Sequence, residues 1–205
     1  MKGRSGLILN ISVLLASVFL LQSCSRNKES MQTYVDNYLE IVKDLKNPAR
    51  VSIIDNGRNA IIAYRKSGFT DIDNAEKAKT SLLEGIQLDS ISLQRAKTLK
   101  SPDLKAEEIT KNLREGISSG IFGNIMFASN YSKAKDQNIE ERKQTILNIR
   151  PGMKYLAEGL NSVVTSMESM QTYIKDNNLK GAEELAHSYK IFKLENDNIK
   201  GFLKN

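Results

Sequence analysis

A heptad repeat of apolar residues in the C-terminal half constrains the fold of this chain more than any other feature. The first row has a member at every seventh position, and its members are Ile139, Ile146, Met153, Leu160, Met167 and Ile174. A second row lies three residues after members of the first, and it consists of Ile149, Leu156, Val163 and Met170. This a/d pattern is typical of helices that pack along their length. It predicts one long helix with a kink or short break at Pro151.

The rest of the chain carries helical periodicity and the residues that start helices. Apolar residues recur at steps of three and four over residues 31–45. Asn47, followed by Pro48, and Asp103 are placed as N-caps of later helices. No segment alternates convincingly between apolar and polar residues with period two, so no sheet is expected. The sequence therefore predicts an all-α antiparallel bundle of about five to six helices, some of them long, in one domain over residues 31–205.

A hexapeptide, Glu-Ser-Met-Gln-Thr-Tyr, occurs twice in the chain, at residues 29–34 and 168–173. The match extends by only one further conservative position, where Val35 corresponds to Ile174. True structural repeats extend over about 20 residues or more. Similarity between two amphipathic helices therefore explains the match better than duplication of a helical hairpin.

The first 24 residues divide into a positive start, an apolar stretch and a short polar segment before the only cysteine. Lys2 and Arg4 supply the positive charge, and residues 7–21 are mostly apolar. A helix that spans a membrane needs about 20 apolar residues, whereas this stretch has the length of a signal peptide. Residues 1–23 are therefore predicted to be a signal peptide, with an uncleaved N-terminal anchor as the alternative.

The end of this segment, Leu21-Gln22-Ser23-Cys24, resembles the lipobox of bacterial lipoproteins. An aliphatic residue lies three positions before the cysteine, and a small residue lies directly before it. The resemblance implies that diacylglycerol is attached to the Cys24 thiol, that cleavage makes Cys24 the first residue, and that its amine is then acylated, for example with palmitate. Ser25 implies sorting to the outer membrane rather than the inner one. Residues 24–30 are expected to form the polar, lipidated tether.

The composition excludes several classes of function. The formal net charge is +6, but the basic residues are scattered and form no block, so no nucleic-acid partner is expected. With Cys24 acylated, no thiol remains for disulfides, thiolate catalysis or metal binding. His187 is the only histidine, so the Glu184–His187 spacing lacks the second copy that a di-iron bundle requires. No metal and no cofactor is therefore expected.

An uncharged segment from Gly116 to Ser132 supports two interpretations. Gly116, Gly120 and Gly123 lie four and three residues apart, so they share one face of a helix, and Phe127 continues that face. Small residues let a second helix approach closely, which favours a packing face. Each glycine costs about 1 kcal/mol in a helix relative to alanine, which leaves open a hinge or a ligand-lining helix.

Gly116-Ile117-Ser118-Ser119-Gly120 also fits the G-x-S-x-G nucleophile motif, with Asp176 and His187 downstream in the usual order. The motif requires a strand before the serine, and the preceding segment is predicted to be a helix. The chain is therefore predicted not to be an enzyme. The sequence favours a membrane-anchored envelope lipoprotein that is a binding or structural module, with a protein partner. The alternative is a periplasmic protein that binds a small molecule or lipid between helices near residues 116–127.

Overall fold

The computed structural model describes residues 27–147 and 150–204 of the 205-residue chain. Throughout these ranges the regular elements are helices and no strand occurs, so the all-α prediction is confirmed. The helices span residues 27–45, α2 (Pro48–Lys66), α3 (Ile72–Thr98), α4 (Leu104–Ser132), α5 (Ile139–Leu147), α6 (Arg150–Asp176) and α7 (Ala182–Lys204).

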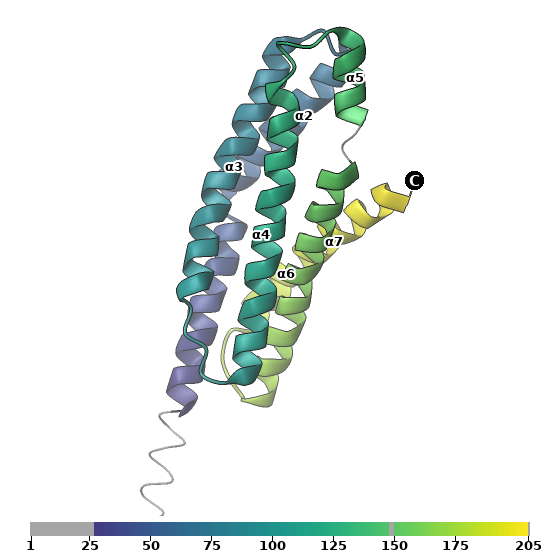
Figure 1. Cartoon of the computed structure of the whole chain (residues 1–205). Coiled ribbons are helices and arrows are strands. Elements are labelled where there is room, and N and C mark those ends of the chain that lie inside the picture. The colour runs from purple at the N-terminus through teal and green to yellow at the C-terminus, as the bar shows by residue number, and fades with distance from the viewer. Residues whose placement is uncertain (1–26, 148–149, 205) are drawn as a thin grey trace, which may run out of the picture.

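The helices form an elongated antiparallel bundle (Figure 1). The chain rises through the 27–45 helix and α2, returns through α3 and rises again in α4. It then descends through α5 and α6, and α7 rises beside α6 until its C-terminal part points away from the bundle. These described helices therefore build five antiparallel rods, within the predicted range of five to six. Among the helices from α2 to α7, contact is most extensive between α4 and α6.

The predicted start signals cap the helices in the structure. The side chain of Asn47 accepts a hydrogen bond from the Ala49 backbone N–H at 2.9 Å, and Pro48 is the first residue of α2. Asp103 caps α4 by accepting a hydrogen bond from the Ala106 N–H at 2.8 Å. Each cap satisfies a backbone donor that has no partner within its own helix.

Two predicted boundaries differ in detail from the structure. Residues 27–30 were expected to belong to the tether, but they are already helical and exposed. The first described helix therefore begins three residues after Cys24, and residues 24–26 lie outside the described range. The expected break near Pro151 falls between α5, which ends at Leu147, and α6, which begins at Arg150.

Apolar side chains are buried in two clusters along the bundle. The first cluster joins the 27–45 helix to the C-terminal half of α3, the N-terminal half of α4, the C-terminal half of α6, and α7. The second joins α2 to the N-terminal half of α3, the C-terminal half of α4 and the start of α6, and Tyr64 and Phe127 lie within it. The heptad residues Met167 and Ile174 are buried in the first cluster, whereas Met153 and Leu160 are half-buried and Ile139 is 43% exposed, so the row forms a fully buried face only in the C-terminal half of α6.

A buried ion pair lies at the junction between the 27–45 helix and α2. Arg50 Nε of α2 lies 2.5 Å from Asp89 Oδ1 of α3, and Arg50 Nη2 donates to the other carboxylate oxygen at 3.2 Å. Arg50 Nη1 also donates to the Leu45 carbonyl at 2.9 Å, at the end of the preceding helix. The side chains of Arg50 and Asp89 are only 18% and 6% exposed. The Arg50–Asp89 pair therefore fixes the junction between the 27–45 helix and α2 to α3.

Candidate functional site

The glycine-rich face of α4 packs directly against α6. A Cβ atom placed on Gly116 would lie 2.7 Å from the Gly159 carbonyl oxygen and 2.6 Å from Val163 Cγ2. In the reverse direction, a Cβ on Gly159 would lie 2.7 Å from the Gly116 carbonyl oxygen and 2.8 Å from the Gly120 nitrogen. Real Cβ atoms essentially never come within 3.0 Å of such neighbours. The two backbones therefore touch, and only glycine fits at either position.

A second glycine pair extends this contact along the same two helices. A Cβ on Gly123 would lie 2.9 Å from the Gly152 carbonyl oxygen, and a Cβ on Gly152 would lie 3.2 Å from Phe127 Cζ. Phe127 is buried, and its ring packs over Gly152 in the second cluster. We refer to Gly116, Gly123, Gly152 and Gly159 together as the glycine contact. These distances favour the packing interpretation of the segment, because α6 occupies the space that a ligand would need.

Gly120 behaves differently from its two neighbours on α4. A Cβ placed on Gly120 would have no atom within 4 Å, so its side chain position faces open space. The expectation that Gly116, Gly120 and Gly123 act as one face holds for the first and third residues only. Sequence reasoning also missed Gly152 and Gly159. Their seven-residue spacing, which matches that of Gly116 and Gly123, was the available signal.

Buried tyrosine hydroxyls bind the first turns of α4. Tyr34 O–H donates to the Ala106 carbonyl at 2.8 Å, and Tyr173 O–H donates to Asp103 Oδ2 at 2.8 Å. The rings of Tyr34 and Tyr173 meet edge to face with their centroids 5.8 Å apart. These tyrosines end the two copies of the repeated hexapeptide. The copies therefore lie on different helices and meet in the first cluster, where their hydroxyls satisfy polar groups at the start of α4.

The buried tyrosines predict a loss of stability at alkaline pH. Burial raises the pKa of Tyr131 to about 12, and burial also raises the pKa of Tyr34 and Tyr38 above the ordinary value of 10.0. A pKa that is higher in the folded state favours the protonated fold, so this stability is complete below the unfolded pKa of about 10 and is lost as pH rises through the folded values. Tyrosinate absorbance and far-UV circular dichroism, followed together from about pH 9 to pH 13, should show ionisation of these tyrosines coinciding with unfolding. Ionisation of all seven tyrosines with the helical signal intact would contradict the expectation.

The residues of the possible nucleophile motif do not form a catalytic site. Gly116 to Gly120 lies within α4, so Ser118 sits on a continuous helix and not on a strained turn after a strand. Ser118 and His187 are both exposed, and no hydrogen bond joins them. Asp176 is instead paired with Lys105, whose Nζ lies 2.9 Å from its carboxylate.

Glu184 and His187 on α7 have the spacing of metal ligands, but in the described part of the chain no further ligand groups complete a metal site. Glu184 and His187 are both exposed on α7. Within residues 27–147 and 150–204, no three histidine, cysteine, aspartate or glutamate side chains converge closely enough to hold a metal ion. In the same ranges, no helix is both long enough and apolar enough to span a membrane.

Two open grooves lie away from the glycine contact. One, of about 820 Å³, runs between α2 and α3 and is lined mainly by polar residues such as Asn56, Asn59 and Asn74. The other, of about 840 Å³, lies between the 27–45 helix and the end of α3, with Tyr34 and Arg95 among its lining residues. Neither groove is lined by any residue of the 116–127 segment.

Large apolar side chains are exposed on each helix from α2 to α7. Val51, Ile54 and Ile62 lie on one face of α2 at steps of three and eight residues, and they are 45%, 39% and 43% exposed. We refer to these three residues as the α2 outer face. Elsewhere, the half-exposed rings of Phe122 and Tyr155 stack edge to face with their centroids 4.7 Å apart. A chain of this size exposes some apolar side chains in any fold, but their alignment on one helix face is characteristic of interaction surfaces.

Cys24, the predicted lipidation site, lies outside the described residues. The first described residue is only three positions after it and belongs to a helix that continues to residue 45. Comparison with known proteins adds no relative, because no protein-family model, curated protein or solved structure matches this chain.

Proposed function

We propose that this protein is a lipid-anchored bacterial envelope lipoprotein whose helical bundle is a non-enzymatic binding or structural module. The observation that carries the proposal is the sequence Leu21-Gln22-Ser23-Cys24 directly after a stretch of signal-peptide length. Two or three acyl chains on Cys24 form a durable anchor, whereas one chain binds a membrane only marginally. The outer membrane is the proposed destination, because Ser25 follows the cysteine.

The geometry of the bundle supports a module that acts through its surface. The predicted ligand-lining segment, residues 116–127, is packed against α6 through the glycine contact. The tyrosine hydroxyls of Tyr34 and Tyr173 are engaged by α4. The α2 outer face, in contrast, presents aligned apolar side chains to solvent. A protein partner is therefore a better match to this bundle than a small molecule held near residues 116–127.

Substitution of Cys24 tests the anchor directly. We expect the wild-type protein to incorporate an alkyne-labelled fatty acid in growing bacterial cells and to sediment with the outer membrane. Cys24→Ala should lose the label completely and leave the outer-membrane fraction, because the acceptor thiol is gone. Asn27→Ala is the matched control, since it alters a nearby exposed residue without touching the thiol or Ser25, and it should keep both properties. Equal labelling and equal fractionation of wild type and Cys24→Ala would refute the proposal.

A further inference from the structure

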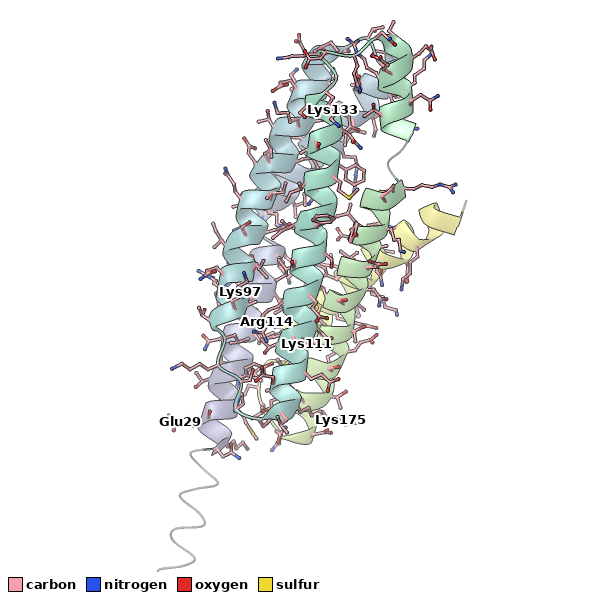
Figure 2. The ribbon with its side chains drawn as sticks, in the orientation of Figure 1. Glu29, Lys97, Lys111, Arg114, Lys133 and Lys175 are labelled. Atoms are coloured by element: carbon pink, nitrogen blue, oxygen red, sulfur yellow. The ribbon has the colours of Figure 1, made fainter. Side chains whose placement is uncertain are left out.

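Three segments that are distant in the sequence meet at one end of the bundle. The Lys180 backbone N–H donates to Gln32 Oε1 at 2.8 Å, which joins the α6–α7 turn to the 27–45 helix. The Lys105–Asp176 ion pair, at 2.9 Å, joins the start of α4 to the end of α6. Figure 2 shows Glu29 and Lys175 at this end and Lys133 at the opposite end. We refer to residues 27–30, 99–105 and 175–181 as the proximal end, because the chain enters the bundle there (Figure 1).

The proximal end exposes a large apolar side chain that the fold does not use. Leu104 is 89% exposed, more than any other large hydrophobic residue whose burial the structure describes. It is the first residue of α4, directly after the N-cap Asp103. Leucine is unnecessary for that cap, because the capping hydrogen bond comes from the side chain of Asp103. A single exposed leucine is ordinary in a folded protein, but its side chain is free to enter an apolar surface at this end of the bundle.

The same three segments carry exposed lysines. Five lysines of the proximal end are exposed, and they are Lys28, Lys100, Lys105, Lys175 and Lys180. The carboxylates of the region are those of Glu29, Asp103 and Asp176, but Asp176 is paired with Lys105, and Asp103 accepts hydrogen bonds from the α4 backbone and the Tyr173 hydroxyl. Within the described residues, the other four lysines take part in no ion pair. An end of the bundle that carries an exposed leucine and five exposed lysines matches the chemistry of an anionic lipid surface, whose phosphates attract the cations while the interface accepts the leucine.

The length of the tether brings this end to the membrane. Cys24 precedes residue 27 by three positions, and three fully extended residues span about 10 Å. If Cys24 carries the lipid, as proposed above, the proximal end cannot lie far from the headgroups. We infer that the proximal end rests on the bilayer that holds the acyl chains, with Leu104 inserted at the interface and the exposed lysines in contact with anionic headgroups. This inference depends on the proposed lipid anchor and adds the orientation of the bundle, whose long axis then points away from the membrane.

A tryptophan placed at position 104 tests this orientation. The chain contains no tryptophan, so Leu104→Trp gives a single fluorescent reporter, and the high exposure of Leu104 leaves the fold undisturbed. Leu194→Trp is the matched control, because Leu194 is 64% exposed on α7, away from the proximal end. Both processed proteins are extracted from membranes and reconstituted in phosphatidylcholine vesicles, with and without phosphatidylglycerol and with brominated acyl chains as quenchers.

We expect the emission of Leu104→Trp to shift to shorter wavelength and to be quenched by the brominated chains about twofold or more, since tryptophan seats at the membrane interface. The emission of Leu194→Trp should remain that of an indole in water. Quenching of Leu104→Trp should be stronger with phosphatidylglycerol and should weaken as salt is raised, because salt screens the lysine–headgroup attraction. Substitution of Lys100 and Lys180 by glutamate should remove that dependence on anionic lipid.

The outcomes separate the inference from the proposed function. If the wild-type protein carries no lipid and does not float with vesicles, the proposed function fails. If it carries lipid and floats, but Leu104→Trp and Leu194→Trp report the same aqueous surroundings, the anchor stands and the orientation is wrong. Quenching of Leu104→Trp that is independent of phosphatidylglycerol and of salt would overturn the role of the lysines.

Discussion

Gly159→Ala is expected to lower the free energy of unfolding by about 2 kcal/mol, because overpacking typically costs 1–3 kcal/mol and here exceeds the roughly 1 kcal/mol that alanine gains in a helix. The new methyl group would lie 2.7 Å from the Gly116 carbonyl oxygen and 2.8 Å from the Gly120 nitrogen. Both neighbours are backbone atoms, so relief requires α4 and α6 to move apart. These two helices share the most extensive contact among α2 to α7. Urea unfolding followed by far-UV circular dichroism measures the change.

Gly120→Ala is the control for this prediction, because it makes the same substitution on the facing helix. The added Cβ has no atom within 4 Å. Only the helix propensity changes, so Gly120→Ala should raise the free energy of unfolding by about 1 kcal/mol. The two substitutions should therefore shift stability in opposite directions. A loss of stability in both, or in neither, would show that α4 and α6 do not pack through the glycine contact.

Asp89→Ala is expected to destabilise the protein by about 3 kcal/mol, since removal of one partner of a buried ion pair leaves the other charge uncompensated. Arg50 would then keep only its hydrogen bond to the Leu45 carbonyl, with a side chain that is 18% exposed. The substitution should weaken packing in both apolar clusters, because Arg50 lies at the junction between the 27–45 helix and α2. Urea unfolding gives the magnitude, and the exchange rates of amide protons near residue 48 show where the fold loosens.

Two control variants distinguish loss of a buried charge pair from loss of packing. Arg50→Met combined with Asp89→Leu removes both charges, so it should recover most of the stability lost in Asp89→Ala. Asp44→Ala breaks the pair of Asp44 with Arg95, whose side chains are 33% and 53% exposed, and should cost less than about 1 kcal/mol. Equal losses in Asp44→Ala and Asp89→Ala would indicate that burial does not strengthen the Arg50–Asp89 pair.

Local sequence signals were sufficient to predict most of the helical architecture. Asn47 and Asp103 cap helices because their side chains accept backbone hydrogen bonds within the next few residues, which needs no knowledge of the tertiary fold. The heptad row was sufficient to predict that Met167 and Ile174 are buried, since period alone determines which face of a helix is apolar.

Features that depend on pairs of helices could not be predicted in the same way. Gly116 was recognised as a candidate packing residue, but its partner Gly159 belongs to a different helix, and the register of α4 against α6 is a tertiary property. The same holds for Arg50 and Asp89, which lie 39 residues apart. Helix spacing also grouped Gly120 with Gly116 and Gly123, although its Cβ position points away from α6.

The start of the folded domain shows a further limit of local reasoning. Residues 27–30 are polar and were expected to form the tether, yet they are helical. Polar residues on the exposed first turn of a helix are ordinary, and hydrophobic periodicity cannot detect a turn that has no buried face. The consequence is functional, because the described helix begins only three residues after the proposed anchor.

The intact mass of the protein extracted from bacterial membranes tests the central claim most directly. The proposed lipoprotein should begin at Cys24, and its mass should equal that of residues 24–205 plus diacylglycerol and an amide-linked acyl chain. Alkaline hydrolysis should remove the ester-linked chains and leave the amide-linked one. A chain that still begins at Met1, or one that begins later with a free Cys24 thiol and no added mass, would contradict the account.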